Sequence, residues 1–206
     1  EEEQLLLGSD NDKSWQNLYK GCNSRTDINC MTVLLKSVTD KPIENTRLLE
    51  QFNRYADLIK MPFFYEATQV SFDSPLIRYA PIMNIKRLFL IQAFIDQQSD
   101  DFLATIHKDT QFWRMILNDS HLLITQMVAI SSIRDDINSL SMAMQQGTLS
   151  PIQLKQLQAD IKTLSQNELD MSNTYEFEFK YGITSFDFIE SQGGMGNSFE
   201  NLFYQV

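Results

Sequence analysis

The chain has 206 residues, 43% of them hydrophobic and 21% charged, so it can bury one sizeable core. Its formal net charge of -10 argues against a nucleic-acid ligand and against adsorption to anionic lipid, because both need a basic surface. No run of about eighteen consecutive apolar residues, the length that spans a bilayer, occurs in it.

Residues that break regular structure are scarce. None of the seven glycines falls between Gly21 and Gly147, and no proline falls between Pro81 and Pro151. An all-β chain needs a turn about every ten residues, so this long uninterrupted segment indicates helices. We therefore predict an all-α fold.

The N-terminal part predicts an arm and two short helices. Residues 1–13 are acidic and polar, and we expect a flexible arm. Short helices are expected over 14–21 and 27–41, the second ending before a proline. Between them, Cys22 and Cys30 enclose a polar loop that suits a disulfide in an oxidising compartment. The alternative is two unrelated thiols, with Cys30 buried.

The following segment has a clear helical rhythm and then loses it. Residues 42–61 place apolar side chains along one helix face, namely Leu48, Phe52, Tyr55 and Ile59. Residues 62–81 contain three prolines and five aromatic residues without a helical period. We expect them to form an ordered connection that packs over the helices by its aromatic side chains.

From Ile82 onward the pattern predicts consecutive helices. They are expected over 82–98, over 100–117 with Ser99 as N-cap, and over 121–146, with apolar residues on one helix face at Leu123, Met127, Ile130, Ile133, Ile137 and Leu140. Ser150 and Gln153 form a capping box that opens the next helix. Tight breaks between helices imply antiparallel hairpins in a tetratricopeptide-like bundle, although the repeat signature and a 34-residue period are absent. The helical domain is predicted over 14–171.

Residues 172–206 differ in character and form a predicted C-terminal arm. "YEFEFKY" fits a strand and a helix equally well, and a flexible "SQGGMGNS" segment follows it. We expect an extended arm whose aromatic residues anchor a protein partner, because Phe and Tyr are frequent interface anchors. These partner-binding candidates are Tyr175, Phe177, Phe179, Tyr181, Phe186, Phe188, Phe199, Phe203 and Tyr204. The alternative is a strap that folds back over its own core.

The residues able to do chemistry do not form a recognisable set. His107 and His121 would lie about 21 Å apart on one helix, too far to share a metal ion. We expect the first on a solvent-facing side and the second in the first turn of a helix. Asp109 and Asp119 are expected to solvate and cap helices rather than act as a catalytic pair. We predict no catalytic residue, no metal ligand and no cofactor.

"FWR" at 112–114 is expected to serve packing. Phe112 and Trp113 continue an apolar stripe with Ile116 and Leu117, while Arg114 can pair with Asp109, Asp119 or a carboxylate of a neighbouring helix. Nucleophilic catalysis requires a Ser or Cys beside a base, and no such motif is present. "GGMG" neither follows a strand nor opens a helix, which argues against a phosphate site.

The stretch 112–140 resembles membrane-anchored extracytoplasmic proteins of gamma-proteobacteria, in which Phe-Trp-Arg precedes a Leu-Ile-x-x-Met-x-Ala run. Residues 112–114 and 123–129 match these two motifs. Among such proteins the chain is most similar to the CpaB-like chaperones of type II-secreted metalloproteases in Acinetobacter. The resemblance implies an N-terminal inner-membrane anchor before residue 1, a periplasmic helical domain, one secreted client bound 1:1 and no catalysis. The R-x-x-F-D-Y signature of the lipase foldases is missing, since "SFDF" lacks its Arg and Tyr.

The leading hypothesis is therefore a non-enzymatic periplasmic protein that binds one protein partner, as a chaperone for a type II-secreted enzyme. One alternative is a cell-envelope hydrolase that uses carboxylates such as Glu50, Asp57 or Asp109. Another is a tetratricopeptide-like scaffold that binds short peptides in a concave groove on the helices of 82–170.

Overall fold

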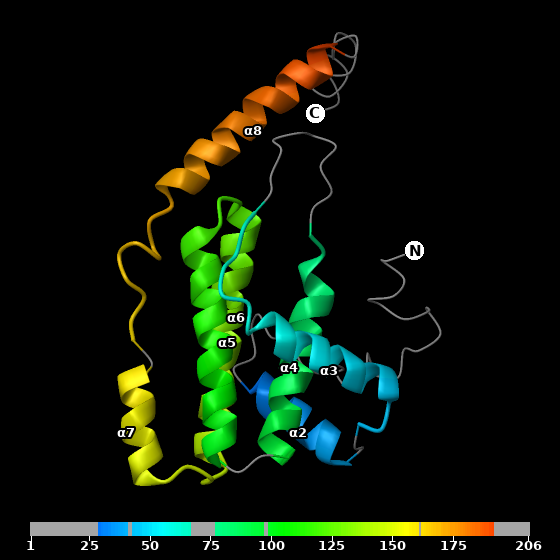
Figure 1. Ribbon diagram of the computed structural model, residues 1–206, viewed down its shortest axis with the longest axis vertical. Helices are drawn as coiled ribbons and strands as arrows, with labels where there is room; N and C mark the ends of the chain where they lie inside the picture. The colour runs from blue at the N-terminus through cyan, green and yellow to red at the C-terminus, as the bar shows by residue number, and fades with distance from the viewer. Residues whose placement is uncertain (1–28, 41–42, 67–76, 97–98, 161, 192–206) are drawn as a thin grey trace, which may run out of the picture.

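The computed structural model describes residues 29–40, 43–66, 77–96, 99–160 and 162–191 (Figure 1). Within these ranges the chain is entirely helical and contains no strand, which confirms the predicted all-α class. The helices are α2 (Cys30–Asp40), α3 (Thr46–Leu58), α4 (Tyr79–Asp96), α5 (Ser99–Asp119), α6 (Leu123–Gln145), α7 (Pro151–Asp160) and α8 (Ser172–Ser191).

Local signals account for several helix ends. Asn45 caps α3, because its side chain accepts hydrogen bonds from the amides of Arg47 and Leu48 at 2.9 and 3.4 Å. The predicted capping box of α7 is present, with reciprocal hydrogen bonds of 2.7 and 3.3 Å between Ser150 and Gln153. α6 ends just before Gly147, whose φ of +67° few other residues adopt.

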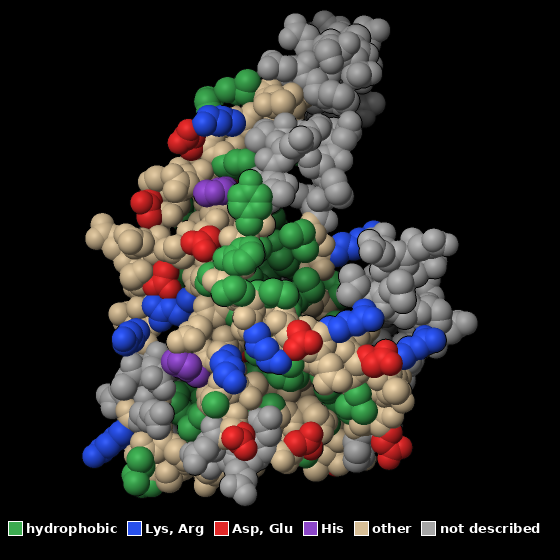
Figure 2. Space-filling view, in the orientation of Figure 1, with side chains coloured by type: hydrophobic (Ala, Val, Ile, Leu, Met, Phe, Trp, Pro, Cys, Tyr) green, Lys and Arg blue, Asp and Glu red, His purple; other side chains and the backbone are tan. Residues whose placement is uncertain are grey.

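α4 begins three residues earlier than its apolar pattern indicates and includes Pro81 in its first turn. A proline is tolerated there because the first amides of a helix have no partner within the helix. Residues 67–76 of the preceding connection lie outside the described residues, and its described aromatic side chains differ in their packing. Phe64 contacts the core, whereas Phe63 and Tyr65 are exposed. Figure 2 shows hydrophobic side chains gathered at mid-height on this face of the molecule.

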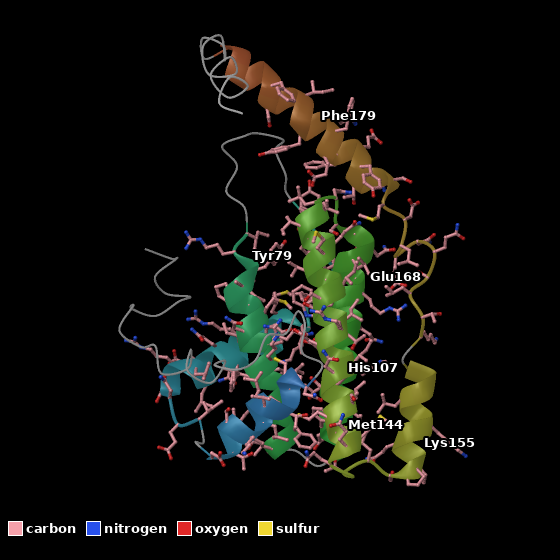
Figure 3. The ribbon with its side chains drawn as sticks, turned by 180° about the vertical axis from the view of Figure 1, so that it is seen from behind. Tyr79, His107, Met144, Lys155, Glu168 and Phe179 are labelled. Carbon is pink, nitrogen blue, oxygen red and sulfur yellow. The ribbon has the colours of Figure 1, made fainter. Side chains whose placement is uncertain are left out.

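The core is built around α4, which packs against α2 and α3 and also against α5 and α6. α5 and α6 lie side by side and share the largest helix–helix contact (Figures 1 and 3). One apolar cluster includes Leu34, Leu90 and Phe102, and a second surrounds Trp113. Phe112, Ile116 and Leu117 belong to this second cluster, so the predicted packing role of the "FWR" segment is confirmed for its two aromatic residues.

α7 packs on α5. The principal helix contact of α8 is with the start of α6, and α8 projects from that end of the bundle (Figure 1). The first part of the predicted arm is thus a helix, and its "YEFEFKY" pattern is helical rather than strand-like. Residues 1–13 and 192–206, which hold the predicted N-terminal arm and the end of the C-terminal arm, lie outside the described residues. No helix in the described ranges has the length and apolarity needed to cross a bilayer.

Cys30 is buried in the first turn of α2. Cys22 lies outside the described residues, so the disulfide between the two stays a prediction.

Candidate functional site

A buried ionic cluster joins four helices at the centre of the bundle. Lys86 of α4 lies between Asp109 of α5 and Asp136 of α6, and none of the three side chains is more than 1% exposed. The Lys86 ammonium donates to Asp136 Oδ1 at 2.6 Å and to Asp109 Oδ2. Tyr55 of α3 donates to the other oxygen of Asp109 at 2.5 Å. The prediction that Asp109 faces solvent was therefore wrong.

Neighbouring polar groups complete this cluster. Thr110 donates to Asp136 Oδ2 at 3.0 Å, and the indole N–H of Trp113 donates to the Tyr55 hydroxyl at 3.0 Å. The Trp113 ring also lies 5.5 Å from the Lys86 ammonium, within the range of a cation–π interaction. Every charged group is thus paired, and the cluster is sealed from solvent.

One cation shared by two carboxylates fixes the direction of the pKa shifts. Burial and the charge of Asp109 together raise the pKa of Asp136 well above its ordinary value, although Lys86 opposes them. Burial lowers the pKa of Lys86, but the two carboxylates outweigh it and raise that pKa overall. Burial and Asp109 also raise the pKa of Tyr55, which keeps its hydroxyl a donor. Such a cluster holds helices together and offers no atom to a substrate.

A second ion pair joins the residues next to Lys86 and Asp136 on the same two helices. Arg87 Nε of α4 donates to Asp135 Oδ2 of α6 at 2.6 Å, with both side chains largely buried. Adjacent basic residues of α4 therefore hold adjacent acidic residues of α6. This double attachment fixes the rotation of α6 about its own axis.

The N-terminus of α6 is held by carboxylates from elsewhere in the chain. Glu66, buried in the connection after α3, accepts hydrogen bonds from the amides of His121 and Leu122 at 2.7 and 3.0 Å. It also accepts the Thr125 hydroxyl at 2.6 Å. Glu178 of α8 accepts the amide of Leu123 at 3.0 Å. Carboxylates at this end complement the helix dipole and replace a local cap, which Leu122 cannot provide.

α6 therefore buries polar and charged side chains beside the apolar residues Ala129, Leu140, Met142 and Ala143. Its buried side includes Thr125, Gln126, Ser132, Asp135, Asp136 and Ser139. Its exposed side carries five large apolar residues that are 44% to 57% exposed, which we call the α6 stripe: Ile124, Met127, Ile130, Ile137 and Met144. Met144 lies near the lower end of α6 in Figure 3. Of the apolar face predicted for this helix, Met127, Ile130 and Ile137 are exposed, whereas Leu140 is buried and Ile133 packs against the core.

α8 also exposes an apolar face beyond the end of the bundle. We call it the α8 face, four side chains that are 47% to 69% exposed: Tyr175, Phe179, Ile183 and Phe186. Phe179 marks the middle of this helix in Figure 3. Among the other predicted anchors, Phe177 and Tyr181 are half-buried. The Phe188 side chain, Phe199, Phe203 and Tyr204 lie outside the described residues.

Arg114 secures the segment between α7 and α8. Its guanidinium forms a two-pronged ion pair with Glu168, at 2.6 and 2.7 Å, and donates to the carbonyls of Lys162 and Thr163 at 2.9 and 3.2 Å. The hydrogen bonds from Arg114 lower the pKa of Glu168 to about 2, against a smaller opposing effect of burial. The carboxylate expected for Arg114 thus comes from this connecting segment.

Beside this ion pair, a groove of about 860 Å³ separates α5 from α7. Its lining combines apolar residues such as Leu103 and Leu157 with Arg114, His107 and Lys162, and includes no carboxylate among the described side chains. His107 lies on the exposed side of α5, as predicted, and is hydrogen-bonded to Gln111 at 2.8 Å (Figure 3).

The remaining candidates for chemistry are dispersed. His121 is exposed in the break before α6 rather than in the helix itself, while Asp119 is exposed at the end of α5. Glu50 and Asp57 are exposed on α3, away from the sealed site of Asp109. In the part of the chain that the structure describes, no group of three His, Cys, Asp or Glu side chains is arranged to hold a metal ion.

Sequence reasoning missed Lys86, Asp136 and Glu66. A signal existed for the first two, because adjacent basic residues interrupt the apolar α4 and adjacent acidic residues interrupt α6. Glu66 gave no signal, since it lies in an irregular connection far from the helix that it caps. Comparison with protein-family models, curated proteins and solved structures gave no significant match to this chain.

Proposed function

We propose that the protein is a non-enzymatic periplasmic protein that binds one protein partner 1:1, as a chaperone of a type II-secreted enzyme. The observation that carries the proposal is the α8 face, a row of large exposed apolar side chains on a helix outside the bundle. A contiguous apolar surface of this kind marks an interaction site, and aromatic residues dominate the binding energy at such sites.

The charge of the chain indicates the chemistry of the partner. With a net charge of -10, the protein attracts a partner whose contact surface is basic around an apolar groove. Glu176 and Glu178 lie beside the α8 face and supply local negative charge, partly balanced by the Lys180–Glu176 ion pair at 2.5 Å. This combination of an apolar row and acidic flanks disfavours a membrane surface and favours a protein client.

The proposal includes the absence of catalysis. The positions of the carboxylates considered for a hydrolase support this part of it. Asp109 is sealed with Lys86, so a substrate cannot reach it without opening the core. Glu50 and Asp57 are exposed on α3, where water screens their charges.

The location and the class of client rest on the sequence. The spacing of Cys22 and Cys30 favours an oxidising compartment, and the resemblance to CpaB-like chaperones implies a periplasmic domain with an N-terminal inner-membrane anchor. The same resemblance makes a secreted metalloprotease the client that we would test first.

A second candidate is a tetratricopeptide-like scaffold built from antiparallel helix hairpins. The groove between α5 and α7 favours it, because its described lining has an apolar floor and basic side chains at Arg114 and Lys162. A short extended peptide with an acidic residue would match this lining. Binding of such a peptide, lost on Leu103→Asp, would assign the function to this groove.

The leading proposal is tested with a type II-secreted metalloprotease, the class of client that the resemblance implies. The two proteins are co-expressed, purified from periplasmic extract, and weighed by light scattering after size-exclusion chromatography. We expect a 1:1 complex that Phe179→Ser with Phe186→Ser weakens by about tenfold or more. The control, Ile152→Ser, removes an apolar residue of α7 that is even more exposed than Phe179 and Phe186, and it should leave binding unchanged. Absence of a stoichiometric complex, or undiminished binding by the α8 variant, would overturn the proposal.

A further inference from the structure

α8 turns its exposed aromatic residues away from the side that attaches it to the bundle. The attached side carries Thr174, which is buried, and Glu178, which accepts the Leu123 amide at 3.0 Å. Tyr175 and Phe179 of the α8 face each follow one of these residues, and one residue step turns a helix by about 100°. α8 therefore cannot bury the α8 face against the bundle while this attachment stays in place.

The chain beyond α8 carries a second apolar pattern. Residues 192–206 lie outside the described residues, and their sequence is "QGGMGNS" followed by "FENLFYQV". In the second part, apolar residues separated by three, one and three positions share one side of a predicted helix. They are Phe199, Leu202, Phe203 and Val206. A helix as short as this is unstable in water by itself, so its apolar side needs a surface to pack on.

The α8 face is within reach of this second part. The connection over 192–198 has seven residues, three of them glycines, and a Gly-rich linker of this length has an r.m.s. span of about 15 Å. α8 ends at Ser191, and along its axis Phe186 lies about 8 Å and Phe179 about 18 Å before that end. A helix over 199–206 would be about 12 Å long, close to the separation of about 10 Å between these two phenylalanines. This end of α8 points away from α5 and α6 (Figure 1), so the described surface nearest to the connection is α8 itself.

We infer that residues 199–206 fold back as an amphipathic helix and pack along the α8 face, covering Phe179 and Phe186. The inference goes beyond the proposed function and does not depend on it, because both packing surfaces belong to this chain. A client that binds the α8 face must first displace this segment. In the absence of a client, the segment shields apolar side chains that would otherwise promote non-specific association.

The tether favours the segment of the same molecule over that of a second copy. A short flexible linker gives the two surfaces that it joins an effective concentration in the millimolar range. A second copy at about micromolar concentration is therefore disfavoured by about a thousandfold. The net charge of -10 on each chain adds repulsion between copies.

Hydrogen exchange of the full chain, followed by mass spectrometry at short labelling times, tests the contact. A synthetic peptide of residues 192–206 gives the exchange rate of 199–206 without α8. We expect slower exchange in the full chain, because packing protects the amides of the helix. Phe179→Ser with Phe186→Ser should raise the rate to that of the synthetic peptide, whereas Ile152→Ser should leave it unchanged. These substitutions lie outside the measured segment, so its intrinsic rates stay the same.

Binding of the dye ANS, which fluoresces on exposed apolar surface, gives the reverse test. Phe199→Ser with Phe203→Ser should raise the fluorescence of the full chain, because the α8 face is uncovered. If the segment did not pack there, the loss of two aromatic side chains could only lower the signal. Tyr204→Ser is the matched control, since Tyr204 lies on the opposite side of the predicted helix and its loss should not raise the signal. Circular dichroism of each variant establishes that it is folded.

Exchange in the full chain as fast as in the synthetic peptide would overturn the inference. Protection that survives Phe179→Ser with Phe186→Ser, or a lower ANS signal in Phe199→Ser with Phe203→Ser, would also contradict it. Protection that disappears on tenfold dilution, together with a dimer in sedimentation equilibrium, would assign the contact to a second copy instead. Failure of the metalloprotease to bind, with the expected exchange and ANS results intact, would refute the proposed client and leave this contact in place.

Discussion

Replacing Lys86 with Met tests whether the buried cluster holds the bundle together. Met has nearly the length of Lys, so Lys86→Met removes the charge with little change in packing. Asp109 and Asp136, at 0% and 1% side-chain exposure, then lose their shared cation. Tyr55 and Thr110 still donate to them, but neutral donors do not compensate two buried charges.

The expected loss of stability is large. Removing one member of a buried ion pair costs about 3–5 kcal/mol, and the raised pKa of Asp136 places this case near the lower value, because that carboxyl can take up a proton. The lost cation–π contact with Trp113 adds about 0.5–1 kcal/mol. We therefore expect a decrease of about 3–4 kcal/mol in the free energy of unfolding. Domains of this size have about 5–15 kcal/mol in total.

Urea unfolding followed by circular dichroism and tryptophan fluorescence measures this decrease. With a slope of about 2 kcal/mol per molar urea, the midpoint should fall by about 1.5–2 M. Lys60→Met, which removes an exposed Lys paired with Asp57, should lower stability by less than about 0.5 kcal/mol. Adding Asp109→Asn and Asp136→Asn to Lys86→Met should restore part of the loss, because no buried charge then remains. A Lys86→Met variant within about 1 kcal/mol of the wild type would refute the reasoning.

Two further predictions concern pH. Because the pKa of Asp136 is raised in the folded state, the folded chain binds more protons than the unfolded chain, so stability should fall as pH rises from about 4 through that raised pKa. Urea midpoints measured across this pH range should show the decrease in the wild type and not in Asp136→Asn. The same decrease in both proteins would contradict the assignment to Asp136. The contribution of Glu168 to stability depends on pH in the opposite direction, because Arg114 lowers the pKa of this carboxyl to about 2. The contribution should be fully present above the ordinary pKa of 4.5 and should vanish as pH falls toward about 2. After allowance for solvent screening, Glu168→Gln should cost about 1–2 kcal/mol at neutral pH and nothing at the acid end, and an equal cost at both would count against the ion pair.

Features with local causes could be predicted from the sequence. The capping box at Ser150 depends on residues three apart, and the packing of Phe112 and Trp113 follows from a helical period over one turn. In both cases the cause lies within a few residues of the effect.

The orientation of α6 could not be predicted in this way. A helical period identifies residues that share a face, but it does not say whether that face meets the core or the solvent. For α6 the answer depends on Lys86 and Arg87, which lie 50 and 48 residues away from the acids that they hold. The helical state of residues 172–191 was equally undetermined, because the spacing of their aromatic residues fits both a strand and a helix.

The hydrogen bond from the Leu123 amide to Glu178 attaches α8 to the first turn of α6. A single neutral amide joins a carboxylate there, and exchanging that contact for water changes the free energy by only about 1–2 kcal/mol. This contact of a twenty-residue helix lies at the turn where Ile124 begins the α6 stripe. Opening of this contact exposes the Leu123 amide to solvent, so the hydrogen-exchange rate of that one backbone position measures how often α8 separates from α6 at this point.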